Sequence, residues 1–181
     1  RHYMIMSLPA RGGQTIRKRR EEQSDILIRP WEDSDFAAAA QAIYRSYRGE
    51  HDSRINSQYR TEEGCVELLS ILTDHIWCGD FQPKVSRVAI DRRTGDRVGV
   101  LIASRIADRA GHIGQISLIP SHQGRGIGRR MIEEALSEFS ERGFECVSLA
   151  VTASNRNAFH LYQSCGFETI HTFPVFYRER R

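Results

Sequence analysis

Residues 116–131 read ISLIPSHQGRGIGRRM, an apolar run followed by a proline, three glycines and three arginines. The apolar run is typical of a strand, and the spacing of the later apolar residues predicts a helix over residues 126–142. Glycines at positions 124, 126 and 128 allow the loop backbone to approach a ligand closely. Because free N–H groups at a helix N-terminus attract anions, the stretch predicts a phosphate-binding loop.

Two common phosphate-binding loops do not fit this pattern. A Walker loop needs Lys and then Ser or Thr after its last glycine, whereas Arg129 and Arg130 follow Gly128. A dinucleotide-binding fingerprint needs a further glycine at position 129 and a parallel strand before the loop. The strands before this loop are instead predicted to be antiparallel, so a third type of phosphate loop is required.

The flanking sequence predicts an ordered series of strands and helices. Residues 25–30 read as a strand, and the DSD motif that follows can cap a helix reaching residue 47. A polar loop over residues 48–60 leads to a helix over 61–76, with Val66, Leu69, Leu72 and Ile76 at helical spacing. Turns at RRTGD and ADRAG divide residues 84–119 into three strands of an antiparallel meander. After the helix at 126–142 come a strand at 145–151, a helix at 155–164, a strand at 167–173 and a final strand from residue 175.

This arrangement resembles the GNAT superfamily of N-acetyltransferases. Pro120, Gln123, Gly126 and Gly128 match its acyl-CoA-binding motif, and SLAVTASNRNAFHLYQSCGFE at residues 148–168 matches its later strand, Asn-headed helix, tyrosine and Gly-Phe pair. The resemblance covers roughly residues 25–177. It implies the α/β (α+β) GNAT fold: a mixed central sheet of about six to seven strands with an antiparallel meander, splayed central strands and flanking helices.

The resemblance implies acetyl-CoA as co-substrate, and the spacing of the histidines predicts no metal site. Residues 116–118 match the strand whose backbone bonds the pantetheine arm, residues 123–129 match the diphosphate loop, and residue 155 matches an asparagine near the arm. The implied cofactor-binding residues are Ile116, Ser117, Leu118, Gln123, Gly124, Arg125, Gly126, Ile127, Gly128, Arg129 and Asn155. Asn155 is equally suited to cap the helix that follows it.

Tyr162 matches the tyrosine that protonates the departing CoA thiolate in this superfamily. Its helical spacing also suits an ordinary core residue, and Cys165 is read as a buried helix cysteine rather than a nucleophile. The general base stays open, because Ala150 occupies the position of a glutamate base in ribosomal-type N-terminal acetyltransferases. The candidates for that base are Glu50, His51, Asp52, His112, Gln115 and Ser117.

Composition sets the remaining expectations. The chain has 181 residues, 40% of them hydrophobic, and a formal charge of +3. Residues 1–24 carry six Arg and Lys against two Glu, which predicts a mobile basic N-terminal segment before a single domain over residues 25–181. No apolar run approaches the roughly 20 residues of a membrane span, so a cytoplasmic protein is expected. The four cysteines show no paired spacing, and the seven histidines show no helical pair that would suggest a metal site.

Three functions are compatible with these features. The first is transfer of an acetyl group from acetyl-CoA to a primary amine of a small molecule or peptide, in a monomer or in a homodimer, which is frequent in the superfamily. The second is a catalytically silent CoA-binding sensor. The third, nucleic-acid binding through the RKRR run at residues 17–20, ranks last because the remainder of the chain is close to neutral. The acceptor amine and the acyl-chain preference are not specified.

Overall fold

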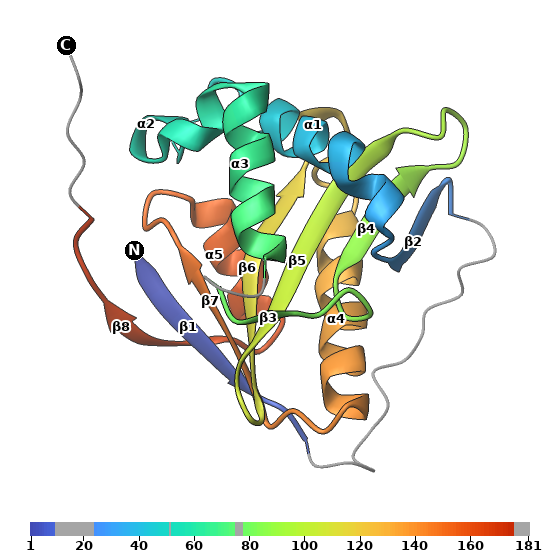
Figure 1. Ribbon diagram of the computed structural model, residues 1–181. Helices are drawn as coiled ribbons and strands as arrows, with labels where there is room; N and C mark the ends of the chain where they lie inside the picture. Colours follow the sequence, from blue (N-terminus) through green and yellow to red (C-terminus); the bar gives the residue numbers. More distant parts are fainter. Residues whose placement is uncertain (10–23, 51, 75–77, 176–181) are drawn as a thin grey trace.

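The computed structural model describes residues 1–9, 24–50, 52–74 and 78–175, and its centre is an eight-stranded mixed sheet (Figure 1). The strand order is β2-β4-β5-β6-β7-β1-β8, with β3 paired to β5. Only β6 and β7 are parallel. The strands are β1 His2–Ser7, β2 Ile26–Pro30, β3 Asp80–Phe81, β4 Arg87–Asp91, β5 Arg97–Ala107, β6 Ala110–Leu118, β7 Cys146–Val151 and β8 Glu168–Thr172.

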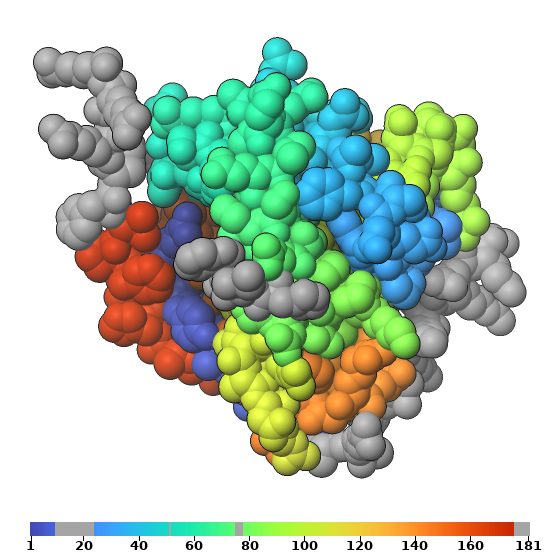
Figure 2. Space-filling view, viewed as in Figure 1, coloured from blue at the N-terminus to red at the C-terminus, as the bar shows by residue number. Residues whose placement is uncertain are grey.

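Helices cover both faces of the sheet and bury two separate hydrophobic cores. The helices are α1 Phe36–Tyr47, α2 Asp52–Ile55, α3 Glu62–Thr73, α4 Ile127–Glu141 and α5 Arg156–Ser164, with 3-10 turns η1 Asp33–Asp35, η2 Ser57–Arg60 and η3 Pro120–His122. Side chains of β5 alternate between the faces: Val100 and Ile102 pack with α1 and α3, whereas Leu101 and Ala103 pack with α4. In the space-filling view α1, α2 and α3 form a continuous layer over one face (Figure 2).

The predicted meander and the predicted helix after the glycine loop are both confirmed. The meander is β4, β5 and β6, and α4 begins at Ile127, one residue later than expected. The helix predicted over 61–76 is shorter and ends at Thr73, and Val66, expected on its buried face, is 42% exposed. Cys65 is buried there with Leu69 and Leu72, while Ile76 lies outside the described residues.

The polar stretch at 48–60, expected as a loop, contains α2 and η2. Asn56 accounts for part of this order, because its side chain accepts a hydrogen bond from the N–H of Gln58 and caps η2. The strand expected from residue 175 is not present at Val175, and residues 176–181 lie outside the described part of the chain. The cap at Asn56 thus stabilises η2 in a stretch whose hydrophobic pattern predicted no helix.

The expectation of a mobile segment over residues 1–24 is wrong for its first part. Strand β1 lies inside the sheet, antiparallel to both β7 and β8, and in Figure 2 it runs beside β8 at one end of the molecule. Met4 is fully buried, so the short apolar run HYMIMS forms a strand through tertiary pairing, while the charge that suggested a solvated tail belongs to later residues. Residues 10–23, including the RKRR run, lie outside the described residues, and the folded unit starts before residue 25.

A buried carboxylate fastens the start of α1 to the sheet. Asp35 is fully buried and receives two hydrogen bonds of 2.7 Å from Arg29 on β2 and one of 3.0 Å from Arg97 on β5. Burial opposes its ionisation, but these hydrogen bonds and one from the N–H of Glu32 outweigh burial and lower the pKa of Asp35. Its contribution to stability is therefore fully present above its usual pKa of 3.8 and is lost as the pH falls through the lowered value.

We expect Asp35→Ala to lower the free energy of unfolding by about 3 to 5 kcal/mol, because it leaves two arginines without their buried counter-charge. Urea denaturation at pH 7 measures this change. The matched control is Asp33→Ala, which removes an exposed carboxylate from the same turn. A loss no larger for Asp35→Ala than for Asp33→Ala would contradict the prediction.

Candidate active site

The glycine loop lies between η3 and the N-terminus of α4 and presents unpaired backbone donors. Gly124 and Gly126 have φ angles of 72° and 76°, a left-handed conformation that favours glycine. The N–H of Gln123 donates to Pro120 and that of Arg130 donates to Gly126, but the N–H groups between them have no backbone acceptor among the described residues. A Cβ atom added at Gly124 or Gly126 would meet no atom within 4 Å. The loop is therefore an open cradle of donors, which suits a diphosphate.

The arginines of this loop have different partners. Arg125 is exposed and forms no hydrogen bond or ion pair within the described part of the chain, so its charge is available to a phosphate. Arg129 instead contacts Glu133 at 3.1 Å and the hydroxyl of Ser164 at 2.6 Å. Its side chain therefore ties α4 to the end of α5, and only its backbone N–H faces the cradle.

Side chains before the cradle hold it in place. The amide of Gln123 donates to the carbonyl of Leu118 at 2.9 Å, which closes the turn onto the end of β6. The imidazole of His122 lies 2.9 Å from the hydroxyl of Ser121 and 3.3 Å from the carboxylate of Asp91. The β4–β5 hairpin is thereby attached to the loop.

An opening between β6 and β7 begins below this loop. The two strands pair only from Ala110 to Ile113, and β7 then continues in pairing with β1 alone. The register between β5 and β6 shifts at Gly114, which marks a bulge at the point of divergence. The two central strands are therefore splayed.

The peptide groups of β6 alternate along the opening. The N–H of Ile119 donates to Val98 on β5, so the peptide groups of Ile116 and Leu118 point away from β5 and toward the opening. The backbone groups of Ser117 point toward β5, and its buried hydroxyl has no hydrogen-bond partner in the part of the chain that the structure describes. Two of the three residues predicted to bond the pantetheine arm, Ile116 and Leu118, thus have backbone groups that face the opening.

Helix α5 places two predicted site residues beside the opening. The side chain of Asn155 accepts a hydrogen bond from Ala158 at 3.1 Å, so it caps the helix, and it donates to the carboxylate of Asp52 at 3.3 Å. The ring of Tyr162 packs against Phe167 in the core on the α4 side. Burial, and then the neighbouring Tyr59 and Asp52, raise the pKa of Tyr162, so its hydroxyl stays protonated at neutral pH. The effect of Tyr59 and Asp52 also indicates that this hydroxyl lies toward the face of the sheet that α1 and α3 cover.

A tyrosine pair on the opposite face completes the surroundings of the opening. Tyr47 and Tyr59 stack with ring centroids 3.9 Å apart. The hydroxyl of Tyr59 donates to Gln115 at 2.9 Å, and the amide of Gln115 donates to the hydroxyl of Tyr47 at 3.2 Å. Tyr47 in turn donates to the carbonyl of Ile116 at 3.4 Å. Sequence patterns did not identify this network, because its members come from α1, η2 and β6 and share no spacing.

Comparison with known proteins agrees with this geometry. The model of the acetyltransferase (GNAT) family matches residues 40–167. The chain belongs to the GNAT family. The mycothiol acetyltransferase of Rhodococcus jostii is 35% identical over 68 residues, which are 38% of this chain and 22% of that protein. This chain therefore aligns with only a small part of the relative's length.

Two solved structures show the same fold. The GCN5-related N-acetyltransferase of Sphaerobacter thermophilus superposes with a TM-score of 0.68 at 21% identity, over 94% of this chain and 48% of that one. The PaiA N-acetyltransferase of Thermoplasma acidophilum, solved in complex with coenzyme A, gives a TM-score of 0.63 at 19% identity, over 83% of this chain and 94% of that one. The splayed strands and glycine loop are therefore those of a GNAT domain.

The candidate bases of this GNAT domain lie in different places. Ala150 is exposed on β7 and brings no ionisable group, and His51 lies outside the described residues. Glu50 is exposed, whereas Asp52 contacts Asn155 beside the opening. His112 lies on β6 before the bulge, on the α3 side of the sheet.

The charged side chains of the stretch 48–60 differ in their contacts. The guanidinium of Arg60 donates to the carbonyls of Ser53 and Arg54, so it is held within the loop. Asp52 is the acidic group that reaches the opening, and it raises the pKa of Tyr47 after the larger effects of burial and Tyr59. The opening therefore has a carboxylate close to the stacked pair Tyr47 and Tyr59.

The surroundings of Cys165 favour the neutral thiol over the nucleophilic thiolate. Burial raises the pKa of its thiol, an effect that nearby Arg129 only partly offsets, so little thiolate forms near neutral pH. All four cysteines are free thiols, as their spacing predicted. Among the described residues no cluster of His, Cys, Asp or Glu is placed to hold a metal ion, and no helix is long and apolar enough to span a bilayer.

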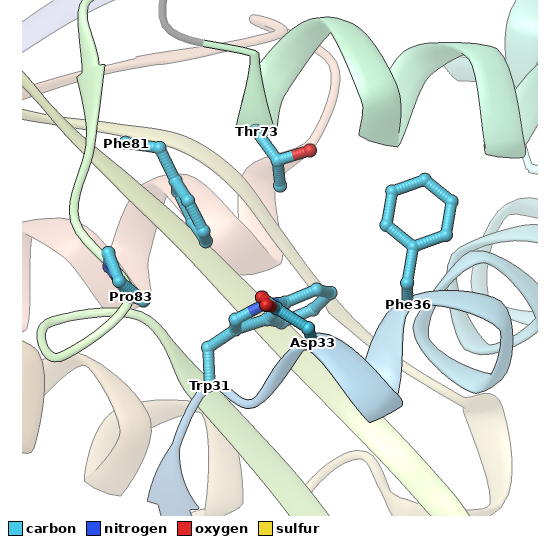
Figure 3. Close-up of a pocket in the computed structure, with 6 residues that line it drawn as sticks. All are labelled: Trp31, Asp33, Phe36, Thr73, Phe81 and Pro83. Atoms are coloured by element: carbon cyan, nitrogen blue, oxygen red, sulfur yellow. The ribbon is translucent and has the colours of Figure 1, made fainter.

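A hollow of about 440 Å³, separate from the opening, has none of the predicted site residues in its lining. Its lining residues are Trp31, Asp33, Phe36, Thr73, Phe81 and Pro83 (Figure 3). Trp31 stands edge-on to both Phe36 and Phe81 and is only 6% exposed. The three rings thus pack mainly on one another, as is usual for aromatic residues in or at the edge of a core. The hollow lies where α1, α3 and β3 meet.

Proposed function

We propose that this GNAT domain transfers the acetyl group of acetyl-CoA to a primary amine by direct attack in a ternary complex. The observation that carries the proposal is the opening between β6 and β7, which has an anion cradle at one end and Tyr162 beside it. The cradle would hold the diphosphate through the N–H groups from Gly124 to Arg129 and the charge of Arg125. The peptide groups of Ile116 and Leu118 would bond the pantetheine arm as an added strand does.

The chemistry needs an acid for the leaving group. The thiol of CoA, if it resembles that of cysteine, has a pKa near 8.5, and a tyrosine of raised pKa keeps a proton to donate as the C–S bond breaks. Peptide N–H groups along β6 would polarise the carbonyl under attack. No covalent bond to the enzyme is required.

The acceptor amine is proposed to arrive as an ammonium ion. Alkyl amines have a pKa of about 10.4, so nearly all of the amine is protonated at neutral pH. Asp52 is placed to attract that charge, while the stacked rings of Tyr47 and Tyr59 offer an apolar wall for the adjoining carbon chain. Small molecules and peptides both carry such an amine, so both classes of acceptor fit the proposal.

Two measurements test the proposed function. Calorimetric titration with acetyl-CoA should give micromolar binding, about 8 kcal/mol, which a few charge-assisted hydrogen bonds of about 1.5 to 3 kcal/mol each can supply. Screening primary amines for acetyl-CoA-dependent release of free thiol should then identify the acceptor. Binding without thiol release for any amine would favour the silent CoA-binding sensor, and no binding would reject the cofactor assignment.

We expect Asp52→Asn to raise the KM for a cationic amine up to about fivefold, because a partly exposed ion pair is worth up to about 1 kcal/mol. The KM for acetyl-CoA should not change. Steady-state kinetics at low and high salt measure the effect, which should shrink as salt screens the charge. Glu50→Gln removes the same charge from an exposed position and is the matched control. An equal KM in both variants would contradict the role of Asp52.

A further inference from the structure

The floor of the opening lies at Gly114. This glycine is exposed although it belongs to β6, a strand in the middle of the sheet. A Cβ atom at this position would come within 3.0 Å of Leu72 on α3 and 3.9 Å of the His112 ring. Leu72 therefore packs where a side chain would stand, and the exposed backbone of Gly114 is the point at which solvent reaches the bulge beside His112.

The hydrogen bonds of His112 determine which ring nitrogen carries the proton. Its Nδ1 lies 2.9 Å from the hydroxyl of Ser148 on β7, and that hydroxyl is 3.4 Å from the carbonyl of Gly111. A carbonyl only accepts, so Ser148 donates to Gly111 and accepts the Nδ1–H of His112. Nε2 then keeps a free lone pair, and it has no hydrogen-bond partner among the described residues.

The surroundings keep this imidazole neutral. Burial lowers the pKa of His112 below its usual 6.5. The neighbouring elements present Ser104 on β5, Ser148 on β7 and Leu72 on α3, none of them charged. Among the described residues near the end of α3 and on β3, the ionisable side chains are Asp74, Cys78 and Asp80, and Asp80 is paired with Arg105. The ring is therefore a proton acceptor at neutral pH.

His112 and Tyr162 reach the opening from different elements: His112 comes from β6, and Tyr162 comes from α5 with its hydroxyl near Tyr59 and Asp52. His112 lies on the face covered by α3, which also presents Gln115 and its two tyrosines. Tyr162 packs in the core on the α4 side. In direct attack one group must take a proton from the incoming amine while another gives a proton to the departing thiolate, so a base is needed in addition to Tyr162.

We propose that Nε2 of His112 is the general base that removes a proton from the acceptor amine, with Ser148 as the positioning residue. The inference rests on the proposed acetyl transfer. The ammonium loses one proton to Nε2, and its nitrogen then forms the N–C bond. That nitrogen loses its second proton as the C–S bond breaks, while the thiolate takes a proton from Tyr162. One proton is released to solvent for each acetyl group transferred, and the others are exchanged among these groups.

The decisive experiment compares His112→Gln with the unmodified protein on two nucleophiles. Glutamine keeps a polar side chain of similar size but cannot take the proton. With an alkyl amine found in the screen, kcat should fall about 10²- to 10⁴-fold, and the decline of kcat at acid pH, set by the His112 pKa below 6.5, should disappear. Hydroxylamine is a weak base that is largely unprotonated near neutral pH, so its acetylation should be nearly unaffected.

A second measurement, the tautomer of His112, can be made before the acceptor is known, and kcat of the same variants follows once it is found. Nitrogen NMR of histidine-labelled protein should show His112 as the Nδ1–H tautomer, and Ser148→Ala should abolish that preference and lower kcat. The matched control is His171→Gln, in the exposed strand β8, which should leave kcat unchanged.

Several results would overturn this inference while leaving the proposed function intact. They are thiol release by His112→Gln at the normal rate, an unchanged acid limb in that variant, an equal loss with hydroxylamine, or an Nε2–H tautomer. Acetyl-CoA titration of the same samples distinguishes a failure of the His112 proposal from a failure of the proposed acetyl transfer. If the unmodified protein fails to bind acetyl-CoA or acetylates no amine, the proposed function fails and the role of His112 fails with it.

Discussion

Gly126→Trp is expected to abolish measurable acetyl-CoA binding. Its φ angle of 76° puts any other residue in a left-handed conformation that costs roughly 1 to 2 kcal/mol. The space next to its Cα is open, so the indole would occupy the cradle itself rather than clash with the protein. The affinity should drop by at least about a hundredfold, because several charge-assisted hydrogen bonds to the diphosphate are lost together. Calorimetric titration measures the loss directly.

Gly95→Trp is the control for this substitution. Gly95 has a φ angle of 77° in the β4–β5 hairpin, and its Cβ position is equally open, so the backbone strain is matched. Thermal melting of both variants checks that each is folded. If both bind acetyl-CoA as the unmodified protein does, the cradle does not hold the cofactor. If both lose binding alike, the effect comes from strain and not from blocking the loop.

Tyr162→Phe is expected to lower kcat for acetyl transfer about 10²- to 10⁴-fold, the usual contribution of a positioned acid. The phenylalanine ring preserves the packing against Phe167, so stability and acetyl-CoA affinity should change little. Because the pKa of the tyrosine is raised, kcat of the unmodified protein should show no loss from its deprotonation near neutral pH. Thiol release measured from pH 6 to pH 9 tests both statements.

Tyr44→Phe removes a hydroxyl from α1 on the other face and should leave kcat unchanged. Two patterns would refute the catalytic role of Tyr162. One is a normal rate at every pH in Tyr162→Phe, which would make the residue part of the core alone. The other is an equal loss in acetyl-CoA affinity and in kcat, which would indicate a distorted opening rather than a missing proton donor.

Local chemistry in the sequence was enough to predict the meander, the glycine loop and the helices around it. Gly124 and Gly126 do adopt positive φ angles, Asn155 does cap α5, and Gly143 follows the end of α4 with a φ angle of 84°. These features depend on residues a few positions apart, which is why turn and capping rules identify them. The family motif is of the same kind, because its proline, glutamine and glycines lie within one loop.

Other features depend on partners far apart in the chain. Strand β1 forms because it pairs with β7 on one side and with β8 on the other. No local pattern in residues 2–7 predicts this pairing. Arg129 was expected to face a phosphate, but Ser164 lies within reach of its guanidinium only after α5 has packed on α4. Local patterns carry no information about such pairings.

The amino-acid sequence alone determined that the chain has a GNAT-type loop, strand and helix in the right order, since each follows from local backbone preference. The proposal of His112 among the candidate bases required the fold. The Gly114 bulge exposes the floor beside His112, Ser148 orients the ring, and the divergence of β7 brings Tyr162 toward the other face. Those relations arise from how β6, β7 and α5 meet, because proton transfer depends on distance and orientation between side chains that the chain itself keeps far apart.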